Sequence, residues 1–177
     1  MAMPTPTDAE LVARAQGGES RAFAELLERH YGTIFRIAFK CCGHRGDAED
    51  IAQNACLRLA ATIGQFRFRA AFTTWLYRVV LSVARDFQRR AAAQRAVETD
   101  YVRQQAVLQG PDPPELTAAE LYAAIRQLPE ALRDTVLLVV GEGLSHAEAA
   151  QALGCAETTV SWRLFQARRQ LRRWLAR

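Results

Sequence analysis

Long hydrophobic runs are missing from this chain of 177 residues. The longest apolar stretch, at positions 135–141, stops at Glu142, far short of the ~18 apolar residues that a membrane span requires. The N-terminus has neither the basic start nor the apolar core of a secretion signal. We therefore expect neither a membrane protein nor a secreted one, and a cytoplasmic location.

Lysine is also almost missing, because 22 of the 23 basic residues are Arg and only Lys40 is Lys. Arg suits bidentate contacts with phosphates and base edges, although an Arg-rich genome would produce the same bias. The distribution of charge says more than the net +4. Positions 58–95 carry eight Arg and one acid, and positions 157–177 carry six Arg and one acid, whereas positions 1–57 and 96–156 are net acidic. Two separate segments therefore look suited to nucleic acid.

Cysteine and histidine are few and form no recognisable site. Cys41, Cys42, Cys56 and Cys155 include no C-x-x-C pair, so we expect reduced thiols. A metal or redox switch remains an alternative, built from His30, Cys41, Cys42, His44 and Cys56, but the spacing fits no usual zinc pattern. No histidine sits in a recognisable catalytic arrangement, so we expect no enzyme, no metal and no cofactor.

The hydrophobic period is helical throughout, which predicts an all-α fold. Capping boxes at Thr7–Glu10, Thr117–Glu120 and Ser145–Glu148 mark three helix starts, and Asp47 is expected to cap another. Three prolines and a glycine fall within positions 110–114, where helix is forbidden. We predict two small helical domains, 1–95 and 117–177, joined by a flexible linker at 96–116.

The second domain carries a helix-turn-helix spacing around Gly154. Small residues precede the turn, and Val160 would anchor the second helix onto the first. Side chains on that second helix could reach base edges and phosphates in a major groove. The candidates are Glu157, Thr158, Thr159, Ser161, Trp162, Arg163, Gln166, Arg168 and Arg169.

Aromatic and Arg residues interleave across positions 64–90, a composition typical of surfaces that bind unpaired strands. Phe72 and Phe87 are expected in the core. The candidate single-strand-binding residues are Phe66, Arg67, Phe68, Arg69, Thr74, Trp75, Arg78, Ser82, Arg85, Arg89 and Arg90.

A third candidate surface is acidic and comprises Asp47, Glu49, Asp50 and Gln53. Helix capping explains two acids there, and the larger set suggests a docking face for a basic partner.

These motifs together resemble the extracytoplasmic-function class of bacterial sigma factors. DAEDIAQ (47–53) and FTTWLYR (72–78) resemble sigma region 2, while LPEALR (128–133) and TVSWRLFQAR (159–168) resemble region 4. The resemblance implies that the acidic helix binds core RNA polymerase, that the aromatic–Arg segment opens the −10 element, and that the last helix reads the −35 element of promoter DNA. It also implies an anti-sigma factor as a further partner.

The chain departs from the family at two places. Family members often have Asn where Ser82 stands. They also commonly have Gly-Thr-Val-Lys-Ser at positions 158–162, where this chain has Thr-Thr-Val-Ser-Trp. Both changes bear on promoter sequence. A helix-turn-helix regulator with a helical sensor domain is the alternative function; it would bind DNA without polymerase.

Overall fold

The computed structural model describes residues 5–98 and 118–175, and within these ranges every regular element is helical. The first domain holds four helices and a short 3₁₀ turn: α1 (Asp8–Gln16), α2 (Ser20–Cys42), α3 (Arg45–Thr62), η1 (Ile63–Gln65) and α4 (Phe72–Glu98). The second holds α5 (Ala118–Arg126), α6 (Glu130–Val136), a π-helical turn η2 (Leu137–Gly141), α7 (His146–Leu153) and α8 (Glu157–Leu175). The predicted all-α class with two helical domains is confirmed.

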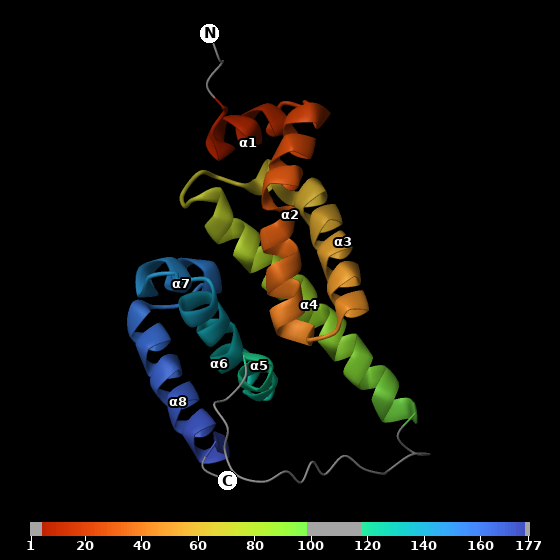
Figure 1. Cartoon of the computed structure of the whole chain (residues 1–177). Coiled ribbons are helices and arrows are strands. Elements are labelled where there is room, and N and C mark those ends of the chain that lie inside the picture. The colour runs from red at the N-terminus through yellow and green to blue at the C-terminus, as the bar shows by residue number, and fades with distance from the viewer. Residues whose placement is uncertain (1–4, 99–117, 176–177) are drawn as a thin grey trace.

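Helix α2 forms the centre of the first domain and packs against α1, α3 and α4 (Figure 1). Its apolar residues recur every three or four positions, so they share one helix face, and Leu26, Ile34 and Ile37 are completely or almost completely buried. Leu59 of α3 and Leu76 of α4 meet them in the same core.

Two of the three predicted capping boxes are confirmed: the Thr7 and Ser145 side chains each accept a hydrogen bond from the backbone N–H three residues on. The third begins at Thr117, which lies outside the described residues. The expectation that Asp47 caps a helix is wrong. Helix α3 begins two residues earlier, with His44 as its N-cap, and the Asp47 backbone N–H donates to His44 Nδ1 at 3.4 Å. An imidazole nitrogen can accept this bond as a carboxylate does, and Asp47 moves into the first helical turn.

The linker predicted at 96–116 lies almost entirely outside the described residues. Helix α4 continues through Glu98, three residues past the domain boundary expected at 95. The sequence has no proline or glycine between Ala70 and Gln109 to end it sooner.

In the second domain, α7 and α8 form the predicted helix-turn-helix. Gly154 ends α7 in the left-handed conformation, at φ 64°, which an L side chain resists. Ala149 and Ala150 of α7 are buried where α8 packs closely, and Val160 of α8 is fully buried.

The two domains are docked on each other, with α7 beside α4 and α5 beside α2 (Figure 1). The Lys40 ammonium donates to the Gly141 carbonyl and to a carboxylate oxygen of Glu142, both at 2.7 Å. Arg36 binds the other Glu142 oxygen at 2.7 Å. Arg85 of α4 lies 3.7 Å from the carboxylate of Asp134. Nothing in the sequence pattern indicated these contacts.

Candidate nucleic-acid and partner interfaces

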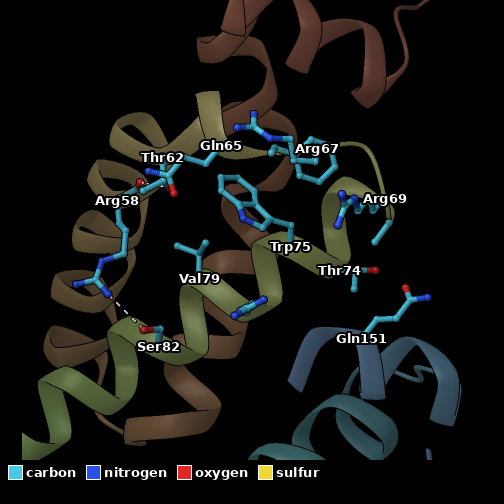
Figure 2. Close-up of a pocket in the computed structure, with 13 residues that line it drawn as sticks. Arg58, Thr62, Gln65, Arg67, Arg69, Thr74, Trp75, Val79, Ser82 and Gln151 are labelled. Atoms are coloured by element: carbon cyan, nitrogen blue, oxygen red, sulfur yellow. Dashed lines mark hydrogen bonds between the residues drawn. The ribbon is translucent and has the colours of Figure 1, made fainter. Parts of the chain in front are cut away.

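A cavity of about 510 Å³ lies where the loop after η1 meets α3 and α4. Figure 2 shows its lining: Arg58 and Thr62 come from α3, Trp75, Val79 and Ser82 come from α4, and Gln151 of α7 stands at the edge. The cavity brings together seven of the residues predicted to bind a single strand: Phe66, Arg67, Arg69, Thr74, Trp75, Arg78 and Ser82.

An aromatic cluster forms the apolar part of this cavity. The Phe66 ring lies 5.5 Å from Trp75, 6.1 Å from Phe72 and 5.0 Å from Phe68, between ring centroids. Phe66 itself is only 5% exposed, so it supports the cluster more than it offers a stacking face. Trp75 is half-buried and opens into the cavity, while Phe72 is buried as expected.

Phe68 stands outside the cavity lining and is 48% exposed. Its backbone has φ 55°, in the left-handed region that non-glycine residues seldom adopt. This conformation costs roughly 1–2 kcal/mol. The loop therefore holds an aromatic ring in solvent, next to the cavity, in a strained conformation.

The charge lining the cavity is of one sign. Arg58, Arg67, Arg69 and Arg78 contribute to it, and no acidic residue does within the described part of the chain. Arg69 and Arg78 form no hydrogen bond or ion pair with any described residue, so their guanidinium groups are available to an anion. An apolar cavity ringed by cations suits a nucleotide, which offers a stacking face and a phosphate.

Arg58 is held in place more firmly than the other cavity cations. Its Nη1 donates to Ser82 Oγ at 3.3 Å and to Asp86 at 3.1 Å, which fixes the guanidinium across the gap between α3 and α4 (Figure 2). Asp86 also accepts from Arg89 at 2.7 Å. The bonds from Arg89 and Arg58 lower the pKa of the Asp86 carboxyl, so it stays ionised and holds both cations.

Three predicted single-strand-binding residues lie elsewhere. Arg85 faces Glu130 and Asp134 of the second domain, and Arg89 pairs with Asp86. Arg90 lines a neighbouring hollow between α3 and α4 that shares Arg58 and Thr62 with the cavity. The net charge was summed over positions 58–95 as one segment. Successive residues of a helix face different directions, so the arginines of that segment reach different surfaces.

The sequence reasoning missed six cavity residues, of which Ala70 and Val79 are apolar and Arg58, Thr62, Gln65 and Gln151 are polar. Arg58 was visible in the basic segment, but only the packing of α3 against α4 places it at the cavity. Gln151 had no signal in the sequence, because it reaches the site only through docking of the second domain.

The predicted −35 residues lie on α8, and their exposure differs. Thr158, Trp162, Arg168 and Arg169 are exposed. Ser161 is exposed as well, but its hydroxyl lies 3.0 Å from His146 Nδ1 and 3.2 Å from the Glu157 carbonyl. Arg163 is partly buried, and its Nη1 points to Cys155 Sγ at 3.7 Å. Of the remaining three, Glu157 is exposed, and Thr159 and Gln166 are partly so.

The acidic candidates begin α3, and a hydrophobic groove continues from them. Asp50 is exposed and forms no side-chain bond within the described residues, while Glu49 pairs with Arg45 at 3.0 Å. Gln53 lines a largely apolar groove of about 750 Å³ between α2 and α3, together with Phe23, Leu27, Glu28, Tyr31, Cys56, Leu57 and Ala60. Leu57 is 69% exposed, a large apolar side chain that the sequence analysis did not single out.

The cysteines and histidines do not gather into a metal site. No three of the His, Cys, Asp and Glu residues in the described ranges are placed to hold a metal ion. Burial raises the pKa of the Cys41 thiol to about 12, which disfavours the reactive thiolate. None of the described helices is long and apolar enough to cross a membrane.

Comparison with known proteins identifies both halves of the chain. Residues 26–94 match Sigma-70 region 2, and residues 118–171 match Sigma-70, region 4. The ECF RNA polymerase sigma factor SigM of Mycobacterium tuberculosis is 35% identical over 169 residues, which cover 96% of this chain and 85% of SigM. The RNA polymerase sigma-H factor of Pseudomonas aeruginosa is 32% identical over 174 residues, 91% of this chain and 90% of that factor.

A solved structure agrees with these sequence matches. CnrH, solved in complex with the cytosolic domain of CnrY, superposes with a TM-score of 0.68 at 26% identity. The alignment covers 96% of this chain and 97% of CnrH. The likeness therefore extends across both domains and includes the order of the two regions.

Proposed function

Because the chain belongs to the ECF class of RNA polymerase sigma factors, we propose a distinct task in transcription initiation for each of its three surfaces. It is an alternative sigma factor that joins core RNA polymerase and directs initiation at promoter DNA. The acidic start of α3 with its apolar groove would bind the polymerase, the cavity in the first domain would hold the opened −10 strand, and α8 would read the −35 element. We also propose 1–95 and 117–177 as the limits of the two domains, with α4 extending three residues beyond the first limit.

The observation that carries the −10 assignment is the cavity lined by aromatic side chains and four arginines with no acid. Melting a duplex requires a place for bases that have lost their stacking partners, and aromatic stacking contributes ~1–3 kcal/mol per base. Trp75 supplies such a face, and Arg69 and Arg78 have guanidinium groups left for the backbone phosphates.

The polymerase-binding surface combines charge with an apolar contact. Asp50 and Asp47 supply the negative charge that steers a basic partner, and Leu57 with the adjoining groove supplies apolar area to bury. A charged face alone would give a weak, salt-sensitive contact. The groove beside it is what a tightly bound partner helix needs.

An anti-sigma factor is also proposed as a partner. CnrH, whose fold this chain shares over both domains, was solved with the cytosolic domain of a second protein. We further propose that the chain works in the cytoplasm, by binding alone, without a catalytic step or a cofactor. The helix-turn-helix regulator and the metal switch are not favoured, because region 2 and region 4 occur together and in order.

The test is reconstitution of the full chain with core RNA polymerase on promoter fragments selected from the host genome. We expect co-purification with core and promoter-specific transcripts. The double variant Asp47→Lys, Asp50→Lys should lose core binding and keep its helical circular dichroism. Glu19→Lys is the matched control, since it also reverses an exposed acid but lies at the opposite end of α2. No transcript from any fragment, with core binding absent, would refute the function.

A second pair of variants tests the −10 cavity within an assembled holoenzyme. Arg78→Ala should bind core normally and yield fewer open complexes, detected by permanganate reactivity of unpaired thymines. Arg21→Ala serves as control, because Arg21 is an exposed arginine of α2 that lines neither the cavity nor the groove. Equal strand opening by both variants would contradict the assignment of the cavity.

A further inference from the structure

The outward face of α8 is unusually apolar for a helix with six Arg in its segment. Thr158, Trp162, Phe165 and Arg169 follow one another at spacings of four, three and four, so they share one face. Trp162 is 58% exposed and Phe165 is 61% exposed. The opposite face, with Val160, Leu164 and Ala167, is buried against the rest of the domain. The two aromatic rings therefore lie outside the core of the domain.

The residues beside Trp162 are already engaged by the protein. The Ser161 hydroxyl is bonded at the Glu157 carbonyl and lies within hydrogen-bond distance of His146. Arg163 turns inward to Cys155. In the first two turns of α8, Trp162 is consequently the largest side chain that projects freely into solvent.

The charge around this face selects the class of partner. Arg168, Arg169, Arg172 and Arg173 are all exposed on the same helix, and cations in this density neutralise phosphates. A helix held in the major groove by such contacts presents its exposed side chains to base edges. The apolar feature at those edges is the C5-methyl group of thymine, which cytosine lacks.

We propose that Trp162 is a specificity-determining residue that selects thymine in the −35 element by covering its methyl group. This inference rests on the proposed reading of the −35 element by α8. Burying one methyl contributes enough for about a fourfold difference in affinity.

The experiment uses the holoenzyme formed from the full chain and core polymerase. Duplexes with a randomised −35 segment are selected by binding and sequenced, for the wild type and for Trp162→Ser. We expect thymine at one or two adjacent positions in the wild-type pool and loss of that preference in Trp162→Ser alone. Trp174→Ala is the matched control, because Trp174 is also an exposed tryptophan of α8 but lies near its far end.

A chemical substitution isolates the methyl group from the rest of the base. Replacing the selected thymine by uracil removes only the C5-methyl and should weaken wild-type binding about fourfold, with no change for Trp162→Ser. Equal thymine preference in both proteins, or equal binding of thymine and uracil by the wild type, would overturn the inference. Weakened core binding by Trp162→Ser would instead assign the face to a protein contact and overturn it as well.

The two levels of failure are distinguishable. If no holoenzyme forms, the proposed function fails and the inference with it. If holoenzyme forms and selects a −35 sequence that Trp162→Ser leaves unaltered, only the inference fails. Because Trp162 is exposed, its replacement should leave the circular dichroism and the thermal unfolding of the chain unchanged.

Discussion

One buried carboxylate, Glu142, holds two cations of the first domain where the two domains dock, and replacing it by Gln tests its contribution directly. The Glu142 side chain is 3% exposed and binds Lys40 and Arg36, each at 2.7 Å. Lys40 is itself only 12% exposed. Burial alone would raise the pKa of Glu142, but the hydrogen bonds from Arg36 and Lys40 outweigh it and lower the pKa below its ordinary 4.5. The ionised form is therefore favoured in the docked state.

The loss of docking free energy in Glu142→Gln depends on which interactions the glutamine side chain retains. Its amide oxygen can still accept one hydrogen bond, but the charge is lost and the Lys40 ammonium stays largely buried without a counter-ion. Breaking a fully buried pair costs 3–5 kcal/mol, and a hydrogen bond between charged groups contributes 1.5–3 kcal/mol. We expect docking to weaken by about 2 kcal/mol, roughly a 30-fold shift toward separated domains.

Small-angle X-ray scattering across pH 7 to 4 measures the effect. A carboxylate with a lowered pKa stabilises the docked state above its free pKa, and this contribution disappears as pH falls through the lowered value. The wild type should therefore begin to expand only as pH falls below the ordinary pKa of a glutamate, while Glu142→Gln should already populate separated domains more than the wild type at pH 7. Glu25→Gln, which removes an exposed pair with Arg29, should follow the wild type. Superimposable scattering of Glu142→Gln and wild type at every pH would refute the reasoning.

Three further predictions concern the turn, a thiol and the core. Gly154→Ala should destabilise the second domain by about 1 kcal/mol, which a urea titration would show as a lower midpoint. No atom lies within 4 Å of the added Cβ, so this cost comes from the left-handed backbone alone. A larger loss of stability would indicate a steric clash instead. Cys41 should resist iodoacetamide at pH 8 in the native protein and react once urea unfolds it, because burial raises its pKa to about 12; rapid native labelling by mass spectrometry would contradict this. Leu59→Ala should cost 2–5 kcal/mol of unfolding free energy by denaturant titration, as Leu59 is completely buried, and a cost under 1 kcal/mol would show that the site collapses.

Local patterns were sufficient for the helices and most of their limits. The capping boxes at Thr7 and Ser145, the left-handed glycine at position 154 and the apolar period of α2 are properties of residues within a few positions of one another. Such signals act over one or two turns, so the sequence displays them directly. The error in the predicted start of α3 is also local, because His44, three residues before Asp47, is the N-cap that Asp47 was expected to be.

Local sequence patterns did not predict which side chains line the cavity. Its loop residues and Trp75 were predicted from composition, but composition could not separate Arg69 and Arg78, which line it, from Arg85, which binds the other domain. Direction around a helix depends on which face is buried, and that depends on partners distant in sequence. The groove beside Leu57 was missed for the same reason, because it exists only where α2 meets α3.

The sequence by itself determined the all-α class, the order of two helical domains, the helix-turn-helix and the two basic segments suited to nucleic acid. Each of these is encoded by neighbouring residues or by net charge, which do not depend on the path of the chain. Only the tertiary structure decided that Gln151 joins the cavity of the first domain, that Trp162 is left free while Ser161 and Arg163 are engaged, and that Lys40 is buried against Glu142. These contacts join residues of different helices, up to about a hundred positions apart in the case of Lys40 and Glu142, and their energy appears only once packing removes water from between them.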